Sequence, residues 1–272
     1  MSRTKAAPPA SGAPAEVGQQ VQGTAAFSKF MLVLQTVADA PGELDIARLA
    51  KLLPYPRGTL YRIVGALISE DMIRENSLTG TYQLGHRLMS LASKSWEAFD
   101  LRTVAHDHIA ALRDATGETV HLAVPSGQEM VYIDKLESPR SVRMTSRIGT
   151  RVSLHSTSVG KAYLAALKPA ERERLLGSIE LVARTPYTIT RSQDLRAEIL
   201  ETQRRSYSTD REENELEIRC FGAAILDRDG TPIGCVSVSI PKYRFNESES
   251  GTFVAELLSR VQAISRSLLS QL

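Results

Sequence analysis

The spacing of apolar side chains is helical in the first third of the chain. Apolar residues recur every three or four positions and predict helices over 27–37, 44–53 and 56–68. Pro41-Gly42 ends the first helix, and Pro56 suits the first position of the third. The positions expected to face a core are Phe27, Phe30, Met31, Leu34 and Val37, then Leu44, Ile46, Leu49, Leu52 and Leu53, and finally Leu60, Ile63, Val64, Leu67 and Ile68.

After the third helix the apolar period shortens to that of a strand. Residues 72–74 and 82–84 flank the turn-forming run NSLTG, which predicts a two-stranded hairpin. Three short helices followed by a hairpin are the parts of a winged helix-turn-helix. Residues 86–99 return to helical spacing and predict a connecting helix.

From about residue 100 onward, strands and helices are mixed. The strands are expected at TVHLAV and MVYIDKL, which form a hairpin across PSGQE, at 141–149, and in a second hairpin around Asp229-Gly230. Helices are expected up to Gly117 and at 158–167, 169–177, 192–206 and 246–271. Hairpins without long crossovers predict an α+β domain on an antiparallel sheet. We therefore expect a winged helix-turn-helix domain at 21–86, a linker helix at 87–100 and a second domain at 101–272.

Composition narrows the class of protein. A chain of 272 residues with 42% hydrophobic residues is long enough for two domains with buried cores. No apolar run approaches the ~20 residues of a membrane span, and two cysteines are too few for a disulfide framework. We therefore expect a cytosolic protein with no membrane association. Residues 1–20 are rich in Ala, Pro and Gly and are expected to be a disordered tail.

The third predicted helix has the chemistry of a DNA reader. No acidic residue occurs between Pro54 and Leu67, and residues 1–90 carry the whole net charge of +2. Arginine can bind guanine or phosphate, hydroxyls can bind phosphate, and a glycine permits close approach. A solvated face or a packing face is the alternative interpretation. The residues expected to contact DNA are Arg57, Gly58, Thr59, Tyr61 and Arg62 in this helix, with Arg74 and Thr79 in the wing.

The second hairpin can be placed in register from its turn. A two-residue turn at Asp229-Gly230 sets Cys220 opposite Ser239 and Gly222 opposite Ser237. One face of the hairpin is then small and faintly polar, while the other face is mostly bulky and apolar. The small face predicts either a ligand cavity with two hydroxyls or a surface on which a helix packs closely.

The stretch HSTSVGK at residues 155–161 allows two interpretations. Ser158 and Lys161 spell the Ser-x-x-Lys pair of some serine acyl enzymes, but neither Lys-Thr-Gly nor Ser-Asp-Asn occurs in the chain. The free N–H groups at the start of a helix bind anions without a lysine. We therefore favour an anion cradle, with Lys161 pointing to solvent, and keep an acyl hydrolase as the rival function.

Metal and cofactor sites are not expected. His106 and His108 are two positions apart on a helix and face different ways, while His121 and His155 are isolated and predicted to have core or surface roles. No Walker phosphate loop and no Gly-x-Gly-x-x-Gly motif is present in the sequence.

Several of these segments together resemble one family. The segment 21–88, followed in order by TGETVHLAV, VYIDKLES, SVRMTSRIGTRVSLHSTSVGKAYLAAL and REENELEIRCFGAAILDRDG, resembles the IclR (isocitrate lyase regulator) family of bacterial transcription factors. The resemblance covers roughly residues 21–265. It implies a GAF-like effector domain, binding to double-stranded operator DNA as a homodimer or dimer of dimers, and control of a catabolic operon by a small organic acid.

The resemblance also implies an effector site in the second domain. Its expected members are Met144, Ser158, Val159, Asp210, Cys220, Ser237 and Ser239, with a small carboxylate held at the backbone of Ser158 and Val159. The chain departs from the family at Glu217-Ile218, where a glycine commonly precedes the Arg-Cys step, and at Arg57-Gly58-Thr59, where Lys-Ser-Thr is often found.

Overall fold

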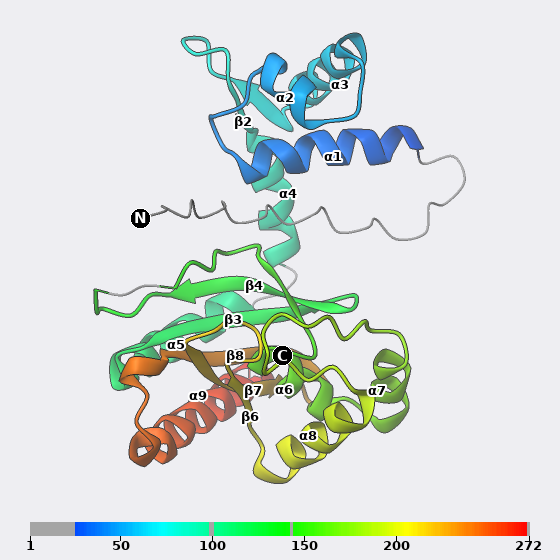
Figure 1. Ribbon diagram of the computed structural model, residues 1–272. Helices are drawn as coiled ribbons and strands as arrows, with labels where there is room; N and C mark the ends of the chain where they lie inside the picture. Colours follow the sequence, from blue (N-terminus) through cyan, green and yellow to red (C-terminus); the bar gives the residue numbers. More distant parts are fainter. Residues whose placement is uncertain (1–24, 98–100, 142–143, 271–272) are drawn as a thin grey trace, which may run out of the picture. The chain divides into compact units, whose positions relative to one another are not determined.

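A computed structural model describes residues 25–97, 101–141 and 144–270 of the chain (Figure 1). The chain divides into two units, Met1–Ala98 and Phe99–Leu272, and each is described by itself. Within the described residues no helix is long and apolar enough to cross a membrane. The predicted tail at 1–20 and the end of the predicted linker at 98–100 lie outside the described residues.

The first unit contains three helices, a hairpin and a fourth helix. The elements are α1 (Ala25–Asp39), α2 (Ile46–Leu52), α3 (Arg57–Ser69), β1 (Ile73–Glu75), β2 (Tyr82–Leu84) and α4 (His86–Glu97). β1 and β2 pair antiparallel, with Ile73 opposite Leu84. This is the helix and hairpin order that the apolar spacing predicts.

The core of this unit follows most of the predicted stripes. Leu34 and Val37 of α1 pack with Leu60 and Leu67 of α3. Pro56, which was predicted at the first position of α3, instead precedes the helix as its N-cap residue. Phe27 and Met31 were expected in the core, but they are 66% and 43% exposed. The buried stripe of α1 is therefore shifted toward Val33, Leu34 and Val37.

The second unit is built on a six-stranded antiparallel sheet in the order β5-β4-β3-β8-β7-β6. Its strands are β3 (Thr119–Ser126), β4 (Glu129–Leu136), β5 (Arg151–Ser153), β6 (Ser208–Arg211), β7 (Ile218–Leu226) and β8 (Pro232–Pro241). Its helices are α5 (Leu101–Thr116), α6 (Ser158–Ala166), α7 (Pro169–Leu176), α8 (Ser192–Arg205) and α9 (Ser250–Ser270), with short 3-10 turns η1 (Lys242–Arg244) and η2 (Glu247–Glu249) before α9.

The strand predicted over 141–149 is wrong. The described part of this segment, residue 141 and residues 144–149, has no strand structure, and the short edge strand β5 comes after it. Sequence analysis also missed β6, because four residues between a helix and a polar loop give little alternation. Both errors concern the edges of the sheet, where fewer ladder hydrogen bonds specify the strand.

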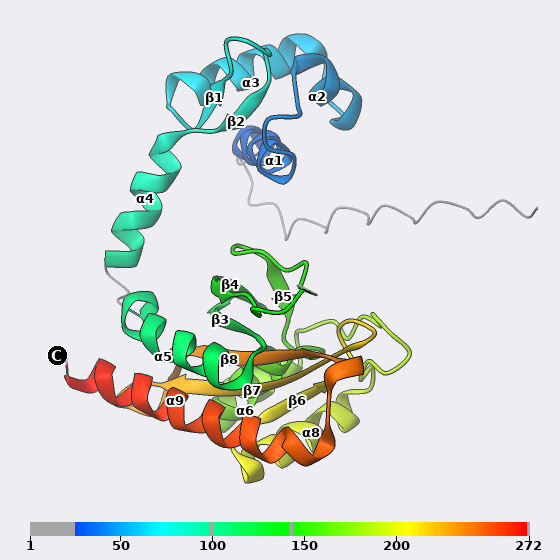
Figure 2. The ribbon, with the colours of Figure 1, turned by 90° about the vertical axis from the view of Figure 1, so that its left-hand side faces the viewer.

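Helices cover the two faces of the sheet differently. α5 and α9 lie side by side on one face, and α6 lies on the other with α7 and α8 beyond it (Figures 1 and 2). The bulky face of the second hairpin packs a core, as predicted, and α5 and α9 cover this core. Its members from the hairpin are Phe221, Ala223, Ile225, Val236, Val238 and Ile240. α6 packs on the opposite, small face of the hairpin.

The register predicted for the second hairpin is correct from the pair Cys220–Ser239 to the pair Ala224–Cys235. Cys220 pairs with Ser239, Gly222 with Ser237, and Ala224 with Cys235. The pairing shifts only beyond Ile225, where the carboxylate of Asp227 accepts hydrogen bonds from the N–H groups of Asp229 and Thr231. The side chains sorted to each face are therefore those expected from the alternation.

Candidate functional site

The outward face of α3 is basic and polar. Arg57, Gly58, Tyr61 and Arg62 are exposed and Thr59 is half-buried, while α3 has no acidic residue along its length. The guanidinium of Arg57 lies 6.0 Å from the centre of the Tyr61 ring, so a cation–π contact holds both on one face. The structure therefore leaves four of the five α3 residues predicted to contact DNA exposed, and it brings two of them, Arg57 and Tyr61, together.

The hairpin after α3 exposes polar side chains, and the apolar Leu78 is exposed in its turn. A guanidinium nitrogen of Arg74 lies 2.8 Å from Nε2 of His86, and the hydroxyls of Thr79 and Thr81 are 2.7 Å apart. The Asn76 side chain accepts the N–H of Leu78 at 2.9 Å and rigidifies the turn. Arg74 and Thr79 are both exposed, as a wing that contacts a nucleic acid requires.

A cavity of about 280 Å³ opens in the second unit, on the α6 side of the sheet. Five of the seven predicted effector residues line it: Met144, Ser158, Asp210, Cys220 and Ser239. Other lining residues come from β3, β4, β5, β7 and the connecting segments: His121, Tyr132, Thr145, Ser146, Arg147, Thr150, Val152, Thr157, Asn214, Glu215 and Ile218. Polar groups from both ends of the domain sequence therefore converge on one space.

The other two predicted effector residues lie beside the cavity. Val159 is fully buried among the apolar residues between α6 and α8, and Ser237 is buried opposite Gly222. A Cβ atom on Gly222 would lie 2.7 Å from the carbonyl of Ser158, so α6 sits directly on this part of the hairpin. The small face thus serves both roles: helix packing in its middle and a cavity wall at its Cys220–Ser239 end.

The cavity wall at Cys220 is neutral. The Cys220 thiol lies 3.2 Å from the Ser239 hydroxyl, and burial raises the pKa of the thiol well above its ordinary value. Burial likewise raises the pKa of the Tyr132 phenol. Both groups therefore stay protonated across the physiological range and offer hydrogen-bond donors without charge.

His121 is the main cavity residue that sequence reasoning missed. Its Nε2 lies 2.7 Å from the Ser146 hydroxyl, and its ring stacks on Tyr132 with centroids 4.4 Å apart. Burial, aided by the nearby Lys135 charge, lowers the pKa of His121 to about 3, so the ring is neutral. The available indication was alternation on β3, which places His121 opposite Ser237 on the small face.

The start of α6 is capped and tightly packed. The Thr157 hydroxyl accepts the N–H of Gly160 at 3.1 Å, and the Ser158 carbonyl accepts the Ser208 hydroxyl at 2.5 Å. The first N–H groups of a helix lack partners within the helix and carry partial positive charge. The Ser158 end of α6, which borders the cavity, can therefore attract an anionic group.

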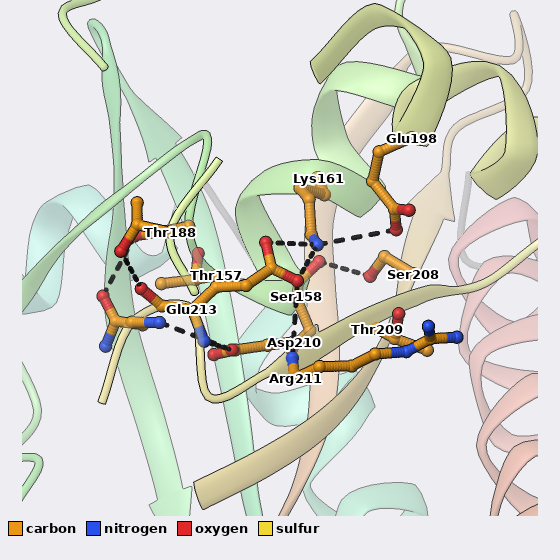
Figure 3. Close-up of polar contacts among 12 residues, drawn as sticks. Thr157, Ser158, Lys161, Thr188, Glu198, Ser208, Thr209, Asp210, Arg211 and Glu213 are labelled. Carbon is orange, nitrogen blue, oxygen red and sulfur yellow. Dashed lines mark hydrogen bonds and ion pairs between the residues drawn. The ribbon is translucent and has the colours of Figure 1, made fainter. Parts of the chain in front are cut away.

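The prediction that Lys161 points to solvent is wrong. Lys161 is fully buried, and its Nζ lies 2.6 and 2.7 Å from the two carboxylate oxygens of Glu213 (Figure 3). A second carboxylate, that of Glu198, lies 3.5 Å away. A lysine held in this way is an ion-pair partner and not a free amine that could activate Ser158, which removes the structural basis for a Ser-x-x-Lys nucleophile.

Asp210 joins this ion pair to the cavity. Its Oδ1 accepts the backbone N–H groups of Glu213 at 2.7 Å and Asn214 at 3.4 Å. Burial, and then the Glu213 charge, raise the pKa of Asp210 to about 7, although Lys161 and the two N–H groups oppose the rise. Asp210 can thus present either a neutral acid or a carboxylate near neutral pH.

Metal-ligand chemistry is not represented among the described residues. No group of three or more His, Cys, Asp or Glu side chains in that part of the chain could hold a metal ion. The cavity is lined by hydroxyls, one imidazole, one thiol, one amide, two carboxyl groups, Arg147 and a few apolar side chains, which is a set suited to an organic ligand with several polar atoms.

Comparison with known proteins places both units in one family. Residues 93–266 match the model for the bacterial transcriptional regulator IclR C-terminal domain, and residues 28–77 match the IclR helix-turn-helix domain. The HTH-type transcriptional regulator XynR of Escherichia coli is 30% identical over 87% of this chain and 94% of its own length.

Solved structures show the same relationship. The Thermotoga maritima IclR structure is 33% identical, with a TM-score of 0.76 over 89% of this chain and 98% of that one. An IclR homolog from Microbacterium hydrocarbonoxydans, complexed with 4-hydroxybenzoate, shares the fold at 23% identity, with a TM-score of 0.78 over 90% of this chain and 99% of that one. The chain therefore belongs to the IclR family of transcriptional regulators: it is a DNA-binding regulator with a ligand-binding C-terminal domain, and it is not an enzyme.

Proposed function

We propose that this regulator controls a catabolic operon in response to a small organic acid bound in the cavity beside α6. The observation that carries the proposal is the convergence of Ser158, Asp210, Cys220 and Ser239 on one polar cavity. The homolog that binds 4-hydroxybenzoate supports a carboxylic acid as the ligand class. Effector binding shifts the balance between DNA-competent and DNA-incompetent states, which requires a different affinity for each state.

The acid is oriented by the two ends of the cavity. Its carboxylate lies at the α6 N-terminus near Ser158, where helix N–H groups favour negative charge. Its other polar atoms meet the Ser239 hydroxyl and Asp210, with the neutral Cys220 thiol as a small wall between them. Val159 and Ser237 support this arrangement through packing.

A thermal-shift screen of small organic acids tests the ligand class. A ligand at 100 times its dissociation constant should add roughly 2.7 kcal/mol to the free energy of unfolding. Ser239→Leu fills the cavity, so it should abolish the shift while operator binding persists. Glu201→Leu, on the exposed side of α8, is the control and should retain the shift. A normal ligand response in Ser239→Leu would place the effector elsewhere.

The operator is read by the exposed face of α3, with the wing beside it. Arg57, Thr59, Tyr61 and Arg62 supply the contacts, and Gly58 allows the backbone to approach the DNA. Losing Arg62 as a guanine contact should cost ~1–3 kcal/mol of binding free energy. Binding of a folded Arg57→Ala plus Arg62→Ala variant to operator DNA, compared with the exposed Arg266→Ala on α9, is the measurement. Unchanged operator affinity in the double variant removes α3 from the interface.

The regulator acts as a homodimer or a dimer of dimers. Two copies of α3 then meet two half-sites of a near-palindromic operator. Phe27 and Met31 lie one turn apart on α1 and are exposed, which suits a face that a second copy covers. Phe27→Asp plus Met31→Asp should therefore reduce dimerisation measured by sedimentation, whereas Leu200→Asp on α8 should not.

A further inference from the structure

Four charged side chains form a chain of ion pairs, and Figure 3 shows three of them, Lys161, Glu213 and Glu198. Lys161 binds Glu213 through both carboxylate oxygens and approaches Glu198, and Glu198 in turn accepts a hydrogen bond from Arg205 at 2.7 Å. The pairs link α6, the segment after β6, and α8. Lys161 is wholly inaccessible to solvent, and the Glu213 side chain is only 8% exposed.

Stability alone is a poor reason for this arrangement. Removing an ammonium and a carboxylate from water costs several kcal/mol each, and a buried pair is often no more stabilising than apolar residues of similar size. The charged pair also lies next to Asp210, and apolar residues in its place would not influence the protonation of Asp210 in the same way. The backbone N–H of Glu213 binds Asp210, and Asp210 lines the cavity.

We propose that Lys161 is a positioning residue of the cavity: together with its partner Glu213, it decides whether Asp210 donates or accepts a hydrogen bond toward the bound acid. The proposal rests on the proposed function in one respect, that an acid occupies this cavity. It goes further by assigning a role to a lysine that does not line the cavity.

The charges around Asp210 define the direction of the effect. The titratable and charged groups that face it are Lys161 on α6, Glu213 and Glu215 after β6, Cys220 on β7, Tyr132 on β4, His121 on β3 and Arg147 in the segment before β5. The Glu213 charge raises the pKa of Asp210 and the Lys161 charge lowers it. An ionised Asp210 repels an anionic ligand in the same cavity, whereas a protonated Asp210 is neutral and can donate a hydrogen bond to one of the ligand's other polar atoms.

Acid binding by the wild-type protein should therefore strengthen as the pH falls through about 7, where Asp210 takes up its proton. Glu213→Gln removes a negative neighbour and should move this midpoint to lower pH, by about one unit. Adding Lys161→Met to Glu213→Gln should move it back upward, because the positive neighbour is now gone and residue 213 no longer titrates. A purely structural defect has no reason to produce two opposite shifts.

A matched control exists in the same domain. Arg244 and Glu118 form another largely buried ion pair, with Nη2 and Oε2 2.7 Å apart, and neither residue lines the cavity. Arg244→Met should lower stability while leaving the pH midpoint at its wild-type value. Asp210→Asn, which cannot ionise, should abolish the pH dependence.

The experiment has two arms on the full-length protein. Carbon-13 NMR titration of aspartate-labelled protein reports the Asp210 midpoint without any ligand, and calorimetry with 4-hydroxybenzoate at pH 5.5 to 8.5 reports its effect on binding. Opposite NMR shifts in the two variants, followed by the binding midpoints, are the expected result. An Asp210 midpoint that stays fixed in both variants, or moves equally in Arg244→Met, overturns the proposal. Normal NMR shifts in a protein whose cavity binds no acid in the thermal-shift screen instead overturn the proposed function.

Discussion

Glu217 occupies a backbone conformation that favours glycine. Its φ is +64°, in the left-handed region, where a side chain costs roughly 1–2 kcal/mol. It belongs to the Glu217-Ile218 step, where the IclR resemblance leads one to expect a glycine before Arg-Cys. The backbone is nevertheless held, because the Glu217 N–H binds the Glu212 carboxylate at 3.1 Å and its carbonyl accepts the Lys242 N–H at 2.7 Å.

We therefore expect Glu217→Gly to raise the free energy of unfolding by roughly 0.5–1 kcal/mol, after the greater freedom of glycine in the unfolded chain is subtracted. Chemical denaturation of the whole protein measures this change. Glu217→Ala is the matched control, since it removes the same exposed carboxylate but keeps the strain. Equal stability changes in the two variants would show that the charge matters and the backbone strain does not.

Asp210 makes stability depend on pH. Its folded-state pKa of about 7 exceeds its ordinary value of 3.8, so between these values the unfolded state has released a proton that the folded state retains. The free energy of unfolding should consequently fall as pH rises from about 4 to 7 and then level off. Asp210→Asn should be more stable than wild type at pH 8, by at most about 4 kcal/mol, and differ little at pH 4. Denaturation at both pH values tests this, with the surface variant Asp107→Asn as control.

Residue roles were predictable from sequence where they depend on local pattern. Cys220 and Ser239 share a cavity wall because hairpin alternation fixes their face. Lys161 could not be placed, since its partner Glu213 lies 52 positions away and enters through β6, a strand too short to recognise. The burial of a lysine can be predicted only when the sequence also indicates the carboxylate that pairs with it.

At the scale of elements, the contact between α6 and β7 limits what the hairpin tolerates. A Cβ atom at Gly222 would lie 2.7 Å from the Ser158 carbonyl and 2.9 Å from the Ser208 hydroxyl. Gly222→Ala should therefore lower the free energy of unfolding by ~1–3 kcal/mol and displace the start of α6. Gly251→Ala on α9 meets no atom within 4 Å and should leave stability unchanged or slightly higher.

Thermal unfolding of the two glycine variants decides the matter. If Gly222→Ala is as stable as Gly251→Ala, α6 does not pack on β7 as closely as the distances indicate.

Long elements such as the β7–β8 hairpin were predictable because their alternation extends over nine or ten residues. The failed strand at 141–149 and the missed β6 show the converse for short edge segments, where contacts in space outweigh local pattern.

At the scale of the whole molecule, the two units have separate cores. One apolar cluster joins α1, α2, α3 and the β1–β2 hairpin, and two others fill the faces of the six-stranded sheet. A unit with its own core can fold by itself. The fragment Phe99–Leu272 should therefore unfold cooperatively and keep the thermal shift caused by an acid ligand, while losing operator binding. Calorimetry of the fragment beside the full chain tests this, and a fragment without a cooperative transition would contradict it.

The two faces of the β7–β8 hairpin have different roles, and this has a consequence for how such regulators diversify. The residues that secure the sheet against α5 and α9 and those that border the cavity alternate along the same strands, so neither set needs to change with the other. Under the proposed function, mutations at Cys220, Ser239 and His121 should change which metabolite is sensed without loss of the apolar core. A biosensor library confined to these positions should consequently yield many folded members, and new inducers can be selected from it directly.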